Sequence, residues 1–121
     1  MFKFITKSMH AWLDYPVALG LIAMPFILGL GAVNPLALWL SVAVGVGALV
    51  VTLLTDHQFG LIRVLPFKLH LAVDLAAGIV FLVAPFALGF TGLEAVYYWA
   101  LGATVVAVVG LDTPEQAPVA A

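Results

Sequence analysis

Long apolar segments separated by short polar links dominate the pattern of this chain. The apolar segments cover roughly residues 10–30, 35–55, 69–90 and 94–111. Each is close to the ~20 residues that an α-helix needs to cross ~30 Å of hydrocarbon. No segment alternates with the period of a barrel strand, and only helices and closed barrels span a bilayer. We therefore predict an all-α, polytopic membrane protein with four helices.

Two kinds of link join the predicted helices. Gly31–Asn34 and Thr91–Gly92 are tight turns, so the helices pair into two hairpins. The middle link is longer and contains Gly60 and Pro66. We expect a single membrane domain over residues 1–121, with repeat 1 at about 10–55, a cytoplasmic linker at about 56–68, repeat 2 at about 69–111 and a short cytoplasmic tail at 112–121.

The two hairpins are copies of one unit. The segment HAWLDYPVALGLIAMPFILG, which starts at His10, returns sixty residues later as HLAVDLAAGIVFLVAPFALG. The residues kept in register are His10 and His70, Asp14 and Asp74, Pro25 and Pro85, Phe26 and Phe86, Leu28 and Leu88, and Gly29 and Gly89. A two-helix repeat inserts both copies the same way round. We therefore predict a four-helix bundle of two tandem parallel hairpins, related by a pseudo-twofold axis along the membrane normal.

Most of the repeated positions share one helix face. At about 100° per residue, His10, Asp14, Leu21 and Pro25 form a single stripe, whereas Phe26 falls outside it. We predict that this stripe faces the other hairpin. Each repeated proline removes a helical hydrogen bond, so we expect the first helix of each hairpin to bend or end near its proline.

Composition supports a membrane location and excludes several functions. The chain is 65% hydrophobic and only 8% charged, with a mean hydropathy of +1.25, whereas about a quarter of the residues of a soluble domain are charged. It has no cysteine, which excludes disulfides and thiolate metal sites. With only four cations and no phosphate-binding motif, we expect no nucleic-acid partner.

The positive charges predict how the chain is oriented. Lys3, Lys7, Arg63 and Lys68 all fall on one side of the predicted bundle, and Glu94 is on the other. By the positive-inside rule, we expect both termini to be cytoplasmic. We interpret the four interfacial cations first as this topology signal, with anchoring to anionic lipid of the bilayer as the alternative. We expect an integral protein of a prokaryotic cytoplasmic membrane, whose first apolar segment is a retained span rather than a signal peptide.

The repeated unit resembles the SPW-repeat family of small membrane proteins, whose two-helix unit carries a Ser-Pro-Trp motif in its first helix. The matching segments are MPFILG at residues 24–29 and APFALG at residues 84–89, followed by Trp39 and Trp99. Both copies lack the serine and carry phenylalanine in place of tryptophan. The resemblance covers nearly the whole chain. It implies a membrane protein and brings no catalytic residues with it.

Ionisable residues in the spans are the candidates for chemistry, because charge inside a membrane is costly. Each His-x-x-x-Asp turn places both of its side chains on one helix face. Aspartates at the ends of the second and fourth helices extend this group. The candidate polar cluster or ligand site comprises His10, Asp14, His70, Asp74, Asp56 and Asp112.

Three interpretations of this cluster remain open. In the first, the residues pair structurally, and the protein is an accessory or assembly subunit of a membrane complex or a homo-oligomer. In the second, His10 and His70 bind a metal ion or haem, and the aspartates orient the imidazoles. In the third, Asp14 and Asp74 serve a proton-linked carrier or a pore formed by an oligomer. Ser41 lies among apolar residues without a base, so we expect no enzyme.

Overall fold

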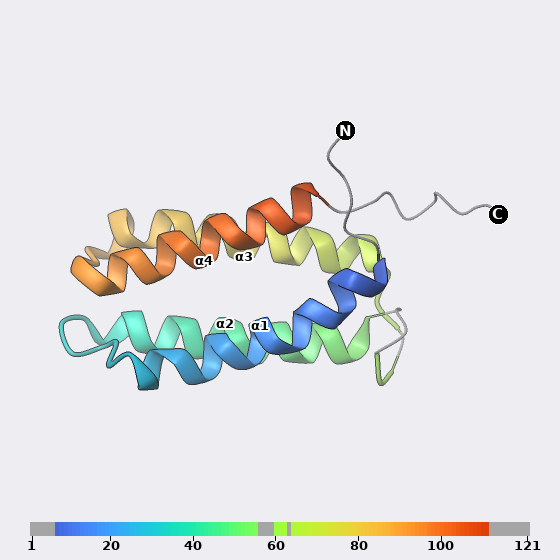
Figure 1. Cartoon of the computed structure of the whole chain (residues 1–121), viewed down its shortest axis with the longest axis horizontal. Coiled ribbons are helices and arrows are strands. Elements are labelled where there is room, and N and C mark those ends of the chain that lie inside the picture. The colour runs from blue at the N-terminus through green and yellow to red at the C-terminus, as the bar shows by residue number, and fades with distance from the viewer. Residues whose placement is uncertain (1–6, 56–59, 63, 112–121) are drawn as a thin grey trace.

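Four helices build the part of the chain that the structure describes. The computed structural model describes residues 7–55, 60–62 and 64–111. Its helices are α1 (Lys7–Ile27), α2 (Pro35–Leu54), α3 (Phe67–Leu88) and α4 (Gly92–Gly110) (Figure 1). The predicted all-α fold is confirmed. Helix α1 begins three residues before the predicted first repeat, and α3 begins within the predicted linker.

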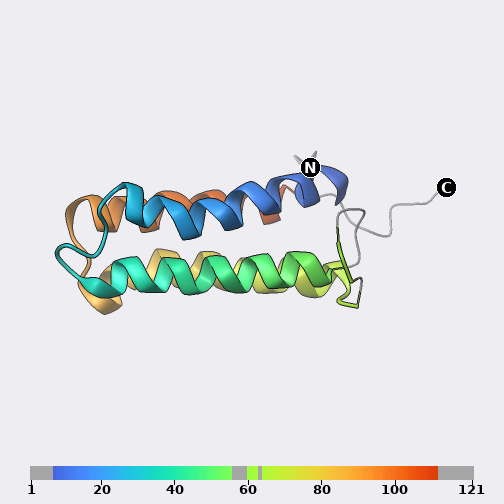
Figure 2. The ribbon, with the colours of Figure 1, turned by 90° about the horizontal axis from the view of Figure 1, so that it is seen from below.

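The helices form two antiparallel hairpins that lie side by side. Helix α1 packs along α2, and α3 packs along α4, whereas the backbones of the two hairpins approach each other at few places, most often between α2 and α3. Figure 1 shows the hairpins as two layers, and Figure 2 shows α1 beside α4 and α2 beside α3. Helices α1 and α3 therefore lie on one diagonal of the bundle. The pseudo-twofold relation of the hairpins stays a prediction.

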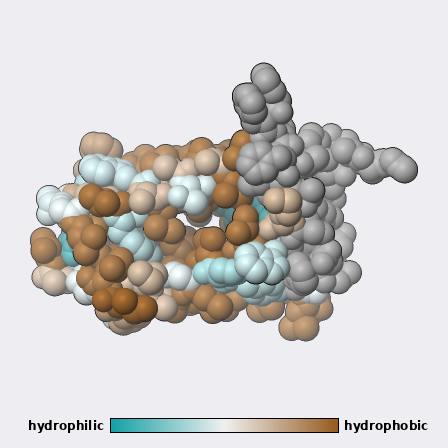
Figure 3. Space-filling model, viewed as in Figure 1, coloured by the Kyte–Doolittle hydropathy of each residue, from teal (hydrophilic) through white to brown (hydrophobic). Residues whose placement is uncertain are grey.

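Length and surface composition fit a bilayer. Helices α2, α3 and α4 are long and apolar enough to cross a membrane, and in α1 the described apolar stretch Trp12–Ile27 is shorter. Large apolar side chains such as Leu19, Val80 and Val96 are exposed on the outside of the bundle. Figure 3 shows apolar side chains over much of the visible face. In a membrane these side chains contact lipid.

Close helix packing within each hairpin depends on glycine. A Cβ atom at Gly45 of α2 would lie 2.8 Å from Ile22 Cγ1 and 3.0 Å from the Ala18 carbonyl oxygen in α1. In the other hairpin, a Cβ at Gly102 of α4 would lie 2.9 Å from the carbonyl oxygen of Gly78 in α3. Small residues let membrane helices approach closely, so these positions bring the two helices of each hairpin together.

The repeated proline and glycine end the first helix of each hairpin. Gly29 and Gly89 have φ angles of 70° and 74°, which a side chain would strain. The amide of Leu30 donates to the Pro25 carbonyl at 2.8 Å, and the Gly29 amide donates to Phe26 at 3.2 Å. This is the Schellman pattern of helix ends. We call residues 28–34 and 89–91 the turn end of the bundle, and the opposite end, around residues 55–67, the linker end.

A serine compensates for the hydrogen bond that Pro25 cannot make. Proline has no N–H, so it leaves the Leu21 carbonyl four residues earlier without its helical donor. The Ser41 hydroxyl of α2 donates to that carbonyl at 2.8 Å. Because this uses the only hydroxyl proton of Ser41, the Tyr97 hydroxyl, 2.7 Å away, donates to Ser41. Tyr97 belongs to α4, so the bond joins the two hairpins.

Aromatic residues fill the bundle toward the turn end. The Tyr98 hydroxyl donates to the Ala37 carbonyl at 2.7 Å and forms a second bond between hairpins. The ring of Tyr98 lies 4.4 Å from that of Phe81 and 4.7 Å from that of Phe90. All three rings are buried. The core is therefore concentrated in this half of the molecule.

Glu94 forms the most polar link between the two turns. Its Oε2 atom accepts from the amides of Gly31 at 2.9 Å and of Val33 and Asn34 at 3.3 Å. In the other direction, the Asn34 side-chain amide donates to the Leu88 carbonyl at 2.9 Å. The Glu94 carboxylate is buried. The two turns are thus bound to each other by residues sixty positions apart in the sequence.

Substitution of Ser41 tests its hydrogen bond to the Leu21 carbonyl, which Pro25 leaves without a helical donor. Ser41→Ala should lower the free energy of unfolding by about 1–2 kcal/mol, because a buried carbonyl loses its donor. In a Pro25→Ala background the new amide reaches the Leu21 carbonyl, so the same change should cost less. Unfolding by SDS in mixed micelles, followed by circular dichroism, measures both costs. Equal costs in the two backgrounds would contradict this assignment.

Removal of the Glu94 carboxylate should loosen the turn end. Glu94→Ala leaves three amides without their acceptor, and we expect it to lower the free energy of unfolding by about 1–3 kcal/mol. Glu94→Gln keeps one acceptor oxygen and should lie between this variant and the parent. Leu93→Ala, at an exposed neighbour, is the matched control and should stay within about 0.5 kcal/mol. A Glu94→Ala protein as stable as the control would refute the link.

Candidate functional site

The linker end brings together the four side chains of the two His-x-x-x-Asp turns. His10 Nε2 lies 3.1 Å from Asp14 Oδ1 and 2.9 Å from Asp74 Oδ2. His70 Nε2 lies 3.2 Å from Asp14 Oδ2 and 3.2 Å from Asp74 Oδ2. Each imidazole therefore contacts both carboxylates, one on its own helix and one on the other hairpin. We call these four residues the His–Asp cluster.

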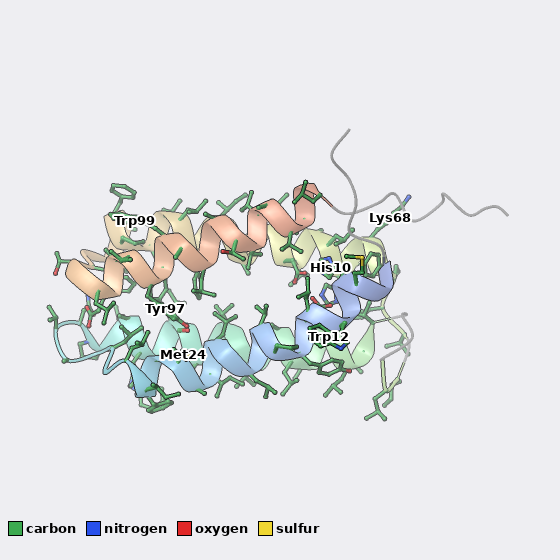
Figure 4. All side chains as sticks on the ribbon, viewed as in Figure 1. His10, Trp12, Met24, Lys68, Tyr97 and Trp99 are labelled. Atoms are coloured by element: carbon green, nitrogen blue, oxygen red, sulfur yellow. The ribbon has the colours of Figure 1, made fainter. Side chains whose placement is uncertain are left out.

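Helix geometry accounts for this convergence. The spacing of four residues puts each histidine above its own aspartate on one face of α1 or α3. The first turns of α1 incline toward α3 in Figure 1. Pro16 lies inside α1 and removes one hydrogen bond from this half of the helix. The diagonal helices therefore meet here, and Figure 4 shows His10 pointing toward the interior of the bundle.

Burial isolates the two imidazoles from solvent. His10 and His70 are each 1% exposed, and their ring centroids lie 5.6 Å apart in an edge-on arrangement. The buried ring of Phe67 lies 5.5 Å from His10 and stacks on His70 at 6.2 Å. Asp14 and Asp74 retain 10% and 19% of their side-chain exposure. The cluster is thus closed around its nitrogen atoms and more open around its carboxylates.

Thr55 fixes the protonation state of one nitrogen of His70. The Thr55 hydroxyl donates to the Val51 carbonyl, and its oxygen lies 2.7 Å from His70 Nδ1. A hydroxyl has one proton, so its oxygen must accept from His70, and Nδ1 carries the hydrogen. With Nδ1 protonated, the contacts of Nε2 with the two carboxylates need a second proton on the ring, or a cation in place of that proton. No sequence pattern indicates the role of Thr55, because a threonine that ends a helix usually bonds only to its own backbone.

The donor atoms of the cluster are close enough to share a ligand. One ligand atom from each of its four residues lies within 4.8 Å of the other three. Haem binding stays a prediction, and the geometry of the cluster favours a smaller ligand. A porphyrin held by His10 and His70 would have to lie between imidazoles that already contact the same two carboxylates. A single small cation is the ligand that suits the geometry.

Of the other predicted polar residues, only Lys68 is described with its side chain. Asp56, Asp112, Lys3 and Arg63 lie outside the described residues. Lys7 begins α1, but its side chain is also outside the described part. Lys68 is exposed in the first turn of α3, at the same end of the bundle as His10 (Figure 4).

The repeated motif residues divide between the interior and the surface. Pro25 and Pro85 are buried. Phe26 and Phe86 point outward, in agreement with their position off the repeated stripe. Each lies against a tryptophan of its own hairpin, Phe26 at 6.2 Å from Trp39 and Phe86 at 5.5 Å from Trp99. These matching pairs are surface features and are not part of the polar site.

A cavity of about 140 Å³ lies between the hairpins, next to the cluster. All four helices contribute to its wall, and Figure 3 shows a hollow between the hairpins. His10, Asp14 and Asp74 form its polar end. Its other lining residues are Leu13, Val17, Leu21, Val44, Ala48, Thr52, Ala77, Leu101, Thr104, Val105 and Val108.

Comparison with known proteins gives one family. A family model described as the SPW repeat domain matches residues 8–112. The match includes both His-x-x-x-Asp turns, both prolines and all four helices except the first residue of α1. Neither the curated proteins nor the solved structures gave a match.

Replacement of Thr55 tests the assignment of the His70 proton. In ¹⁵N-histidine-labelled protein, His70 Nδ1 should give the chemical shift of a protonated ring nitrogen. Thr55→Ser keeps the hydroxyl and should preserve that signal. Thr55→Val removes the acceptor, so the hydrogen bond from Nδ1 is lost and the Nδ1 shift should move. An unchanged His70 spectrum in Thr55→Val would contradict the assignment.

Proposed function

The chain belongs to the SPW-repeat family of membrane proteins, and we propose that its His–Asp cluster binds one divalent transition-metal ion. The observation that carries the proposal is the convergence of two imidazole Nε2 atoms and two carboxylates from both hairpins. Such an ion would join α1 to α3. It would act where the backbones of the described hairpins otherwise approach each other at few places.

The distances in the cluster suit a small tetrahedral ion. In a zinc site with metal–ligand bonds near 2.0–2.1 Å, neighbouring ligand atoms lie about 3.4 Å apart. The nitrogen–oxygen separations in the cluster are 2.9–3.2 Å. A small outward movement of the four side chains would therefore admit the ion. The hydrogen bond between Thr55 and His70 supports this, because metal-ligating histidines usually donate their second nitrogen to a neighbouring acceptor.

Charge and ligand type narrow the choice of ion. Two ionised carboxylates with two neutral imidazoles carry two negative charges, which one divalent cation balances. Imidazole suits zinc, iron, nickel or copper better than magnesium or calcium, which prefer oxygen ligands alone. We take Zn²⁺ as the reference ion. The positive-inside rule would place the linker end at the cytoplasmic face, so the ion would come from the cytoplasm.

A metal-linked bundle is compatible with an accessory or assembly role in a membrane complex or a homo-oligomer, because the ion would stabilise the conformation that a partner binds. A proton-linked carrier has less support. Among the described residues, the cavity wall beyond the cluster has no ionisable side chain. Protons would therefore lack a relay across the bundle.

Metal analysis of the purified protein tests the proposal. The full chain, purified in mild detergent, should bind one Zn²⁺ per chain by mass spectrometry of the metal. Co²⁺ in its place should give the visible bands of a tetrahedral site. At a hundredfold excess of Zn²⁺ over Kd, the free energy of unfolding should rise by about 2.7 kcal/mol.

Variants separate this site from adventitious binding. His10→Ala, His70→Ala and Asp74→Ala should each weaken the affinity about 100-fold or more, since even the loss of a residue that orients a ligand costs about 10–100-fold. His57→Ala removes the third histidine of the chain and is the matched control, expected to bind normally. Full metal occupancy in both His10→Ala and His70→Ala, or no ion in the parent protein, would overturn the proposal. If the parent protein binds no ion, only protons join the histidines and aspartates of the cluster.

A further inference from the structure

The cavity between the hairpins has walls that favour an apolar molecule. Its aliphatic lining comes from all four helices. The two hydroxyls in the wall already donate to their own helices, Thr52 to the Ala48 carbonyl and Thr104 to the Ala100 carbonyl, each at 2.7 Å. A water molecule needs two to four polar partners, which these walls do not offer away from the cluster. The body of a ligand in this space is therefore hydrocarbon.

One end of the cavity accepts hydrogen bonds. Asp14 and Asp74 line it with side-chain exposures of 10% and 19%, whereas His10 is 1% exposed. The accessible polar atoms at this end are thus mainly carboxylate oxygens. Both oxygens of Asp14 already contact the histidines, whereas Asp74 contacts the two histidines through Oδ2. Asp74 can therefore accept from a ligand with Oδ1. The matching head group is a hydrogen-bond donor.

Size and access complete the description of the ligand. An apolar protein cavity of about 150 Å³ holds one benzene molecule, and this cavity measures about 140 Å³. Figure 3 shows the hollow opening on the face where α1 and α4 lie in front. This face would meet the hydrocarbon of the bilayer, so a lipid-soluble molecule reaches the cavity without crossing water.

We propose that this cavity binds a small lipophilic alcohol or phenol, with its hydroxyl group donating to Asp74 Oδ1 and its apolar body between the hairpins. This site is distinct from the metal site, although Asp14 and Asp74 belong to both. It does not require a bound metal, because the carboxylates accept hydrogen bonds in either state. Measurements with and without Zn²⁺ therefore separate the two proposals.

Fluorine NMR with a matched pair of probes tests the site. 4-Fluorophenol, titrated into the full chain in mild detergent, should show a saturable shift beyond that in empty micelles, with one site per chain. 4-Fluorotoluene has nearly the same shape and no hydroxyl, and it should bind about 10-fold more weakly, since one hydrogen bond to a charged acceptor contributes about 1.4 kcal/mol. Equal affinities would overturn the role of the carboxylates, and no saturable shift would overturn the site.

Two adjacent alanines distinguish the cavity from the lipid-facing surface. Ala77 lines the cavity, and Ala76 is exposed on the outside of α3. Ala77→Leu should fill the space and abolish the 4-fluorophenol shift, whereas Ala76→Leu should leave it unchanged. A shift that survives Ala77→Leu in a protein with parental circular dichroism would place the probe in the micelle or on the surface, and would overturn the proposal. Probe binding in a protein that binds no Zn²⁺ would overturn only the metal proposal.

Discussion

Polar groups that hydrocarbon cannot solvate hold the two hairpins together. Apolar contact gives helices little reason to associate in a bilayer, because lipid tails are as apolar as leucine. The hairpins meet instead where a polar atom of one needs a partner on the other. At the linker end each histidine contacts an aspartate of the opposite hairpin. At the turn end Glu94, Tyr97 and Tyr98 bond across the interface. The middle has no such bond among the described residues, and the cavity lies there.

Pro25 affects both the end of its own helix and the contact between the two hairpins. The Pro25 carbonyl accepts the Schellman bond that ends α1, and the missing Pro25 N–H leaves the Leu21 carbonyl without its helical donor. Ser41 supplies that donor and thereby orients an oxygen toward Tyr97. The helical hydrogen bond that α1 lacks is thus replaced by a bond to α2, and the same serine then bonds to α4 of the other hairpin. Ser41 is small and buried, so the same residue also permits close approach of α1 and α2.

Periodicity predicted the main features of the fold and of the site. The four apolar segments and the register of the repeat were enough to place His10, Asp14, His70 and Asp74 together. They did not predict Thr55, because its bond to His70 depends on how the linker returns α3 beside the end of α2. They also did not predict the role of Glu94. The spacing Thr91-x-x-Glu94 is that of a capping box, in which the glutamate serves its own helix, but here its carboxylate binds the other hairpin. Contacts set by the packing of separate elements leave little trace in local spacing.

The asymmetry at the turn end has a consequence for the duplicated architecture. Positions 34 and 94 correspond in the repeat, yet one carries an amide and the other a carboxylate. Asn34 caps α2 and reaches across to Leu88, whereas Glu94 gathers three amides from the opposite turn. A symmetric pair of first hairpins would have two donors and no carboxylate, and a pair of second hairpins would have two buried negative charges. The halves are complementary rather than interchangeable, so a complete turn end requires one copy of each.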